Sequence, residues 1–193
     1  MPRLRAANLA CRRGSRLLFE HLQFAIAPGQ LAWVRGRNGR GKTSLLRIAA
    51  GLAPPESGRL ERDESASVFI GHANGLKDEL SAHESLSFLL RLHGRPASGE
   101  GVDAALRRLG LFERRHAPVR TLSQGQRRRV ALARLAVEDT ASLWILDEPF
   151  DALDAEGAEC LHALLREHLQ RGGSVLLSSH VPVPAAFEID LDR

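Results

Sequence analysis

The segment GRNGRGKT, residues 36–43, constrains this chain more than any other feature. It matches the pattern G-x-x-x-x-G-K-[ST] and lies between an apolar run at 31–34, which predicts a strand, and a stretch with helical periodicity. The glycines allow the backbone to curl so that successive N–H groups point inward, and a helix beginning near Gly41 adds the positive end of its dipole. The segment therefore predicts a loop that cradles a polyphosphate. The apolar face expected for the following helix is formed by Leu45, Ile48, Ala49 and Leu52.

The side chains of this loop indicate what each would contact. Lys42 is one of only two lysines in the chain, and it is expected to reach the β- and γ-phosphates of a nucleotide as a point charge. The Thr43 hydroxyl is expected to ligate Mg²⁺. The alternative, a glycine-rich turn with an accidental lysine, is disfavoured because lysine is so scarce here. The residues of this segment predicted to bind nucleotide are Gly36, Arg37, Asn38, Gly39, Arg40, Gly41, Lys42, Thr43 and Ser44.

Two other apolar runs end in polar side chains that suit phosphate chemistry. Residues 143–146 are followed by Asp147 and Glu148, and residues 175–179 are followed by His180. Buried carboxylates need a cation or a proton, so Asp147 is expected to complete the Mg²⁺ shell and Glu148 to accept a proton from attacking water. His180 is expected to hydrogen-bond the γ-phosphate or the water. We therefore predict Glu148, His180 and Lys42 as the catalytic residues, the alternatives being a helix-capping acid pair and a structural histidine.

The order of the predicted elements indicates an α/β fold. Strands and helices alternate before about residue 71 and again after residue 121, as expected for a largely parallel sheet covered on both faces. Residues from about 81 to 121 interrupt this alternation, so they are expected to form a helical insertion. Ligands bind beyond the carboxyl ends of strands in open parallel sheets, so Gly36, Asp147 and His180 should converge on one site. The two helical stripes of the insertion are Leu86, Leu89, Leu90 and His93, and Val102, Ala105, Leu106 and Leu109.

Composition limits the class of protein further. The chain has 193 residues, 44% of them hydrophobic and 26% charged, which is ordinary for a globular protein. No apolar run reaches the roughly 18 residues of a membrane span, and the N-terminal residues do not resemble a secretory signal, so we expect a cytosolic location. The net charge of +4 comes mainly from arginine. Such an excess of positive charge is compatible with binding a nucleotide, a nucleic acid or an anionic membrane surface, and it does not distinguish among these partners.

The segment LSQGQ, residues 122–126, indicates a resemblance to a known protein family. Ser123 followed three residues later by Gln126 predicts a capping box at the start of a helix. Together with residues 36–43, residues 143–148 and His180, it stands in the order and approximate spacing of the ABC-type ATPase subunits, and residues 151–154 resemble the D-loop of that family. This resemblance spans almost the whole chain. It implies one ABC ATPase domain over 1–193, with a RecA-like P-loop core and an N-terminal antiparallel β-subdomain at 1–71 and 122–193, and a helical subdomain at 72–121.

The resemblance also implies a head-to-tail dimer that binds ATP and Mg²⁺. Ser123 and Gly125 of one copy would then contact the ATP bound by the other copy, with Gln126 and Asp154 also near nucleotide. Two positions depart from the family pattern. Arg13 stands where most members have an aromatic residue that stacks on adenine, and a guanidinium can also stack on a base. His72 stands where most members have a glutamine, and it is expected to copy the metal contact of that glutamine poorly, since Mg²⁺ prefers oxygen ligands.

Within this family the chain resembles the ATP-binding subunit of the haem exporter of bacterial cytochrome c maturation. That resemblance implies a peripheral protein at the cytoplasmic face of the inner membrane, partnered by integral-membrane subunits, whose ATP hydrolysis is linked to haem export or to haem release from its carrier. An ABC transporter subunit for another cargo, such as a lipid, a peptide or a drug, is the first alternative. A nucleic-acid-associated ABC protein is the remote one, and no nucleic acid is expected as a partner because few aromatic residues accompany the arginines.

Overall fold

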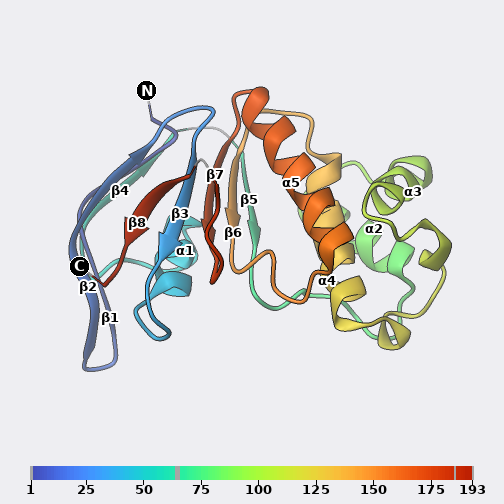
Figure 1. The fold of residues 1–193 in the computed structure, drawn as a ribbon, viewed down its shortest axis with the longest axis horizontal. Helices are drawn as coiled ribbons and strands as arrows, with labels where there is room; N and C mark the ends of the chain where they lie inside the picture. Colours follow the sequence, from blue (N-terminus) through green and yellow to red (C-terminus); the bar gives the residue numbers. More distant parts are fainter. Residues whose placement is uncertain (1, 64–65, 185, 193) are drawn as a thin grey trace. The chain divides into compact units, whose positions relative to one another are not determined.

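The computed structural model describes residues 2–63, 66–184 and 186–192, and the chain divides into two compact units (Figure 1). The sheet unit comprises Met1–Gly71, Thr140–Pro149 and Glu167–Arg193. The helical unit comprises His72–Asp139 and Phe150–Arg166. The assignment of residues 72–121 to a helical subdomain of one ABC ATPase domain stays a prediction.

The sheet unit contains a three-stranded antiparallel sheet in the order β2-β1-β4. Its strands are β1 (Leu4–Arg13), β2 (Arg16–Ile26) and β4 (Ser57–Arg62). β1 is central, and its register pairs Leu4 with both Ile26 of β2 and Arg62 of β4. Leu4 and Ile26 are fully buried, because one face of the sheet packs on the hydrophobic core.

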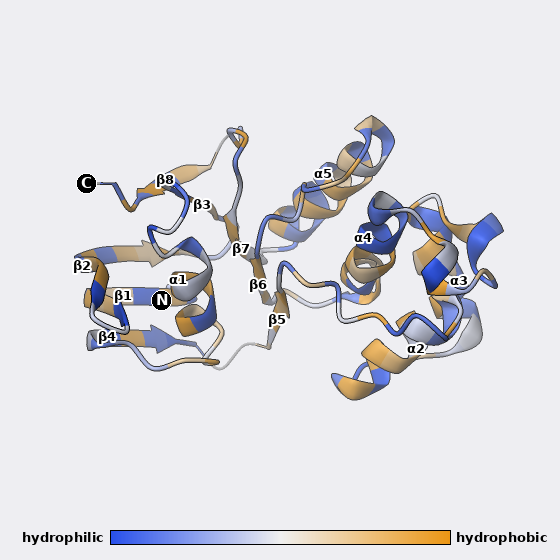
Figure 2. Cartoon of the chain, turned by 90° about the horizontal axis from the view of Figure 1, so that it is seen from below, coloured by the Kyte–Doolittle hydropathy of each residue, from blue (hydrophilic) through white to orange (hydrophobic). Residues whose placement is uncertain are grey.

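The second sheet of this unit is parallel and has the order β5-β6-β7-β3-β8 (Figure 1). Its strands are β3 (Leu31–Arg35), β5 (Ser67–Ile70), β6 (Leu143–Leu146), β7 (Ser174–Ser178) and β8 (Phe187–Asp190). β6 and β7 are buried at every position, and the part of β6 that can be seen in Figure 2 is mainly orange. A continuous apolar run is expected of a strand whose two faces are both covered, and the predicted α/β class is confirmed.

Helix α1 (Lys42–Ala49) follows β3 and contacts β7, β1 and β6. Leu45, Ile48 and Ala49 are buried, as their spacing predicts. The prediction that Leu52 shares their face is wrong, since its side chain is 57% exposed. The helix ends at Ala49, and the left-handed Gly51 (φ 73°) takes the chain away from the helical path before Leu52.

The helical unit is built from capped helices. It contains α2 (Ala82–Leu92), α3 (Gly99–Arg108), α4 (Gln124–Leu132) and the part of α5 (Ala155–Gln170) that precedes Glu167. Three short 3₁₀ turns, η1 (Phe112–Arg114), η2 (Val119–Thr121) and η3 (Ala133–Val137), connect or extend them. The predicted apolar stripes of α2 and α3 are buried except for His93, which is exposed because it is the residue that caps the C-terminus of α2.

A buried aromatic stack lies in the sheet unit. His168, on α5, is fully buried, and its ring stacks on Trp144 of β6 with centroids 3.7 Å apart and planes 9° apart. Its Nε2 atom lies 2.9 Å from the carbonyl oxygen of Ser142. Burial disfavours the charged imidazolium and lowers the pKa of His168 from 6.5 to about 4.

The stability of the chain is therefore expected to decrease in mild acid through His168. The folded-state pKa lies below the unfolded value, so the neutral ring stabilises the fold fully above about pH 6.5, and this contribution is lost as the pH falls towards about 4. A shift of this size corresponds to roughly 3 kcal/mol of unfolding free energy. Urea unfolding of the wild type and of His168→Gln between pH 7.5 and pH 4.5 measures this contribution to the unfolding free energy. If the unfolding free energies of the two proteins depend equally on pH, the prediction is contradicted.

Candidate functional site

The backbone of residues 36–43 joins β3 to α1 through a loop that requires glycine. Gly36, Gly39 and Gly41 have φ values of 148°, 79° and 102°, which other residues rarely adopt. A Cβ atom on Gly41 would also lie 3.0 Å from Leu18 and 3.2 Å from Phe19. Helix α1 has no side-chain cap and no acidic residue in its first turn. The N–H groups at its N-terminus are therefore not capped by a side chain of the helix itself, which suits an anion.

The ammonium group of Lys42 lies at the centre of this loop. The side chain is 9% exposed, and Nζ donates a hydrogen bond of 2.9 Å to the carbonyl oxygen of Gly36. Nζ also lies 3.8 Å from Oε1 of Glu148. A buried cation of this kind is held by the loop and is directed towards the end of β6.

Oxygen atoms gather where α1 meets the ends of β6 and β7. The Thr43 hydroxyl donates to Oδ2 of Asp147 at 2.9 Å, and the Ser178 hydroxyl donates to Oδ1 of the same carboxylate at 2.8 Å. Asp147 is 1% exposed. The donor set is oxygen only, which fits Mg²⁺, a cation that usually takes one or two protein oxygens and fills its remaining positions with phosphate and water. Among the described residues no group of three or more His, Cys, Asp or Glu side chains could hold a metal ion by itself.

Glu148 follows directly and adopts a left-handed backbone with φ 46°. This conformation is uncommon for a residue with a side chain and is retained where the surrounding structure determines it. The N–H of Glu148 donates to Oγ of Ser178 at 2.9 Å. Its Oε2 accepts a hydrogen bond of 3.0 Å from the N–H of His180, and its Oε1 lies 3.4 Å from Nε2 of His180. The predicted convergence of the ends of β3, β6 and β7 is thus a feature of the structure.

Ser178 was not singled out from the sequence, although it fixes both acidic residues. It bonds the Asp147 carboxylate and the Glu148 backbone at the same time. A serine at the end of an apolar strand gives no signal of its own, because the information lies in the pairing of β6 with β7. Similarly, the indole Nε1 of Trp33 donates to the carbonyl oxygen of Ser179 at 2.9 Å, which ties the end of β7 to β3.

Arg13 borders a pocket of about 290 Å³ beside the start of α1. Thr43 and Ser44 of the loop line the same pocket, together with Cys11 and Arg47. Arg13 therefore lies near the loop, as a residue that stacks on a base would. Its contact with a base stays a prediction.

A segment that the sequence did not single out also contacts the loop. Oδ2 of Asp192 accepts a hydrogen bond of 2.9 Å from the N–H of Arg37, and its Oδ1 lies 3.0 Å from Nε of Arg40. The Arg40 guanidinium also donates to the carbonyl oxygen of Leu191 at 2.8 and 3.1 Å. The two arginines of the loop are thereby held by the residues that follow β8.

In the helical unit, Ser123 begins α4 with the predicted capping box. Its hydroxyl accepts from the N–H of Gln126 at 3.2 Å, and the Gln126 side chain accepts from the N–H of Ser123 at 3.0 Å. A Cβ atom on Gly125 would overlap the carbonyl oxygen of Ala152 or force it to shift. A glycine at this position therefore allows α4 to approach residues 151–154 closely.

The other predicted residues of the helical unit have structural partners. Asp154 accepts a hydrogen bond of 2.9 Å from the N–H of Gly157 at the start of α5, and its second oxygen lies 3.2 Å from the Arg129 guanidinium. His72 is exposed, with Nδ1 3.9 Å from Oδ2 of Asp151. The nucleotide contacts of Ser123, Gly125, Gln126, His72 and Asp154 stay predictions.

The loop, the acidic pair and the histidine on this parallel sheet define a P-loop nucleotide site, and the comparisons specify its class. The chain belongs to the ABC transporter family, whose model matches residues 19–151. A solved ABC transporter ATP-binding protein from Pyrococcus furiosus has the same fold, with a TM-score of 0.85 at 22% identity over 98% of this chain and 97% of that chain. The predicted ABC ATPase fold class is confirmed.

Curated relatives with higher sequence identity share the name CcmA. The cytochrome c biogenesis ATP-binding export protein CcmA 2 of Cupriavidus metallidurans is 46% identical, over 94% of this chain and 91% of the relative. The protein CcmA of Pseudomonas putida is 48% identical, over 92% of this chain and 89% of the relative. The predicted resemblance to ATP-binding subunits of cytochrome c maturation is confirmed.

Proposed function

We propose that this chain is the ATP-hydrolysing subunit of an ABC transporter that acts in haem export, or in haem release from a carrier, during cytochrome c biogenesis. The observation that carries the ATPase activity is the cluster of Lys42, Asp147, Glu148 and His180 at the ends of β3, β6 and β7. The role in cytochrome c biogenesis is supported by the names of the relatives.

The binding step follows from the charge of the loop. The phosphates of ATP accept hydrogen bonds from N–H groups within residues 36–44, and Lys42 neutralises part of their charge. Thr43 and Asp147 are the ligands for Mg²⁺, which when bound neutralises further charge on the phosphates. Lys42 leaves its contact with the Gly36 carbonyl to reach the phosphates.

The hydrolytic step uses the carboxylate of Glu148 as a general base. A base must lie within hydrogen-bond reach of the attacking water and must be aimed by its neighbours. The N–H of His180 holds one oxygen of Glu148, and Ser178 holds its backbone. The His180 imidazole, about half exposed, then has access to the γ-phosphate or to the water.

The assembly completes the site from a second copy. Ser123, Gly125 and Gln126, at the start of α4, would face the γ-phosphate of the nucleotide bound by the partner, where the helix dipole stabilises negative charge. Asp154 lies in the segment that resembles the D-loop of the family. His72 stands where most members have a glutamine that links the γ-phosphate to the transmembrane partner. In this proposal the integral-membrane subunits dock on residues around 72–90.

The location of the chain is proposed to be peripheral, at the cytoplasmic face of the bacterial inner membrane. No helix of the described residues is both long and apolar enough to cross a bilayer. In this proposal the partner subunits hold the chain at the membrane.

Reconstitution of the chain with the membrane subunits of a cytochrome c maturation system tests the proposal. ATP hydrolysis and ATP-dependent release of haem from its carrier are expected in the complex, and both should be lost when Lys42 is replaced by Ala. ATP hydrolysis without any release of haem would support the ATPase part of the proposal and contradict the role in cytochrome c biogenesis.

A substitution at Asp192 tests whether its contacts with residues 37 and 40 order the loop for ATP binding. Asp192→Ala is expected to weaken ATP binding about fivefold, because the N–H of Arg37 loses its acceptor and Arg40 keeps only the Leu191 carbonyl, so the loop must be ordered again on binding. The rate of hydrolysis at saturating ATP should change less than twofold. Titration calorimetry with ATP measures the affinity, and Asp192→Glu should recover most of it. An unchanged affinity in Asp192→Ala would show that the anchor is not needed.

A further inference from the structure

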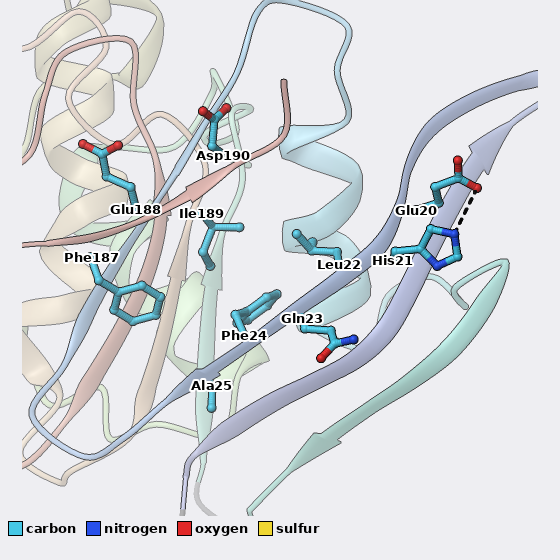
Figure 3. Close-up of a pocket in the computed structure, with 10 residues that line it drawn as sticks. All are labelled: Glu20, His21, Leu22, Gln23, Phe24, Ala25, Phe187, Glu188, Ile189 and Asp190. Atoms are coloured by element: carbon cyan, nitrogen blue, oxygen red, sulfur yellow. Dashed lines mark ion pairs between the residues drawn. The ribbon is translucent and has the colours of Figure 1, made fainter. Parts of the chain in front are cut away.

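A pocket of about 500 Å³ separates the two sheets of the sheet unit at a place where each has an open edge (Figure 3). Among the described residues, β2 pairs only with β1, and β8 pairs only with β3. An edge strand presents N–H and C=O groups that have no ladder partner, and it can therefore accept another strand.

The lining of the pocket shows that it borders these edges. Residues 20–25 of β2 and residues 187–190 of β8 all take part, without a gap in either run. Side chains alternate between the two faces of a strand, so a pocket on one face would be lined by every second residue. Consecutive lining residues mean that the backbone edge itself faces the pocket.

The side chains around the pocket have a definite chemistry. Leu22, Phe24 and Phe187 are partly buried and pack against the core, and Ile189 lies between them (Figure 3). The three carboxylates of the pocket are Glu20, Glu188 and Asp190, and none of its ten lining residues is a lysine or an arginine.

Two of these carboxylates are paired with an arginine of the neighbouring strand. Arg35 of β3 pairs with Glu188 at 2.8 Å and with Asp190 at 3.1 Å. Glu20 lies near His21, with 4.0 Å between the nearest atoms (Figure 3). The lining of the pocket therefore carries three carboxylates and no lysine or arginine, and two of the carboxylates share Arg35.

We propose that this pocket is a docking site for an extended segment of a partner protein in which basic and apolar residues alternate. The segment adds a strand to the edge of β2 or β8, so that main-chain hydrogen bonds give affinity and alternate side chains give specificity. Its apolar residues cover Leu22, Phe24 and Phe187, and its basic residues lie towards Glu20 or share Glu188 and Asp190 (Figure 3) with Arg35 on the other side of β8.

The charge of the pocket argues against other occupants. A nucleic acid or an anionic membrane surface is repelled by the carboxylates. A second copy that offered its own β2 or β8 edge would place like charges opposite each other, which is destabilising between strands. A basic extended segment can cover the apolar surface, pair with an open strand edge and neutralise the carboxylates.

The probe for the experiment is a labelled eight-residue peptide that alternates lysine with valine. Fluorescence anisotropy with the full chain is expected to show binding that weakens as salt is added. A peptide that alternates glutamate with valine should bind at least tenfold more weakly. Hydrogen exchange of backbone amides within 20–25 or 187–190 should slow in the presence of the basic peptide, because a new ladder protects them. Equal binding of the two peptides, or protection confined to other residues, would overturn the proposal.

Two glutamates of the antiparallel sheet form a matched pair of variants. Glu20→Lys reverses a charge at the pocket and is expected to weaken binding of the basic peptide about fivefold. Glu61→Lys makes the same change on β4, on the opposite edge of the sheet, and should alter binding less than twofold. Equal effects of the two variants, or self-association of the chain that Glu20→Lys abolishes, would reject the partner segment as the occupant. ATP hydrolysis is a separate readout, so its failure and that of peptide binding are distinguishable.

Discussion

Replacing Glu148 by Gln is expected to lower ATP hydrolysis in the assembled complex by at least about 100-fold, while ATP binding is retained. A positioned general base contributes roughly 10²–10⁴ to a rate, and an amide accepts no proton at neutral pH. The amide has the size of the carboxylate and can still accept the hydrogen bond from the N–H of His180. Single-turnover hydrolysis and nucleotide titration of the same preparation separate the two effects.

The control for this variant is Glu113→Gln, at an exposed position of η1. It makes the same chemical change away from the strand ends and should leave hydrolysis unchanged within twofold. If Glu148→Gln hydrolyses ATP at a rate close to that of the wild type, another group is the base, and His180 becomes the first candidate because it lies beside Glu148.

Gly173→Ala is expected to cause the largest loss of stability, about 3 kcal/mol of unfolding free energy and a decrease of roughly 6–12 °C in Tm. A Cβ atom on Gly173 would overlap the ring of His168, which is fully buried and stacked on Trp144. The ring cannot move without breaking the stack and the contact with the Ser142 carbonyl. Thermal unfolding followed by circular dichroism at pH 7.5 measures the change.

Gly172→Ala is the matched control in the same turn. A Cβ atom at Gly172 would meet no atom within 4 Å, but the residue has φ 80°. The expected loss is therefore only the cost of a left-handed backbone, roughly 1 kcal/mol. A loss in Gly173→Ala that is no larger than in Gly172→Ala would mean that the core around His168 adapts to the added methyl group.

Motifs whose parts lie close in the sequence could be predicted well. The loop around Gly41, the capping box of Ser123 and Gln126, and the buried strands β6 and β7 each depend on local rules: glycine where the backbone turns, an acceptor before a helix, and apolar runs in parallel strands. Helical periodicity places Leu52 and His93 on apolar faces, although both are exposed, because periodicity does not reveal where a helix ends.

The phosphate loop, the polar residues that follow three apolar strands, and the family of the chain can be predicted from the amino-acid sequence. The bond from Ser178 to Asp147, the contacts of Asp192 with Arg37 and Arg40, and the overlap that a side chain at Gly173 would cause become visible only in the folded chain. The physical reason is that each of these contacts depends on which strand lies beside which and where the chain crosses between them. Residues 155 positions apart, such as Arg37 and Asp192, share no periodicity or spacing that a sequence pattern could express.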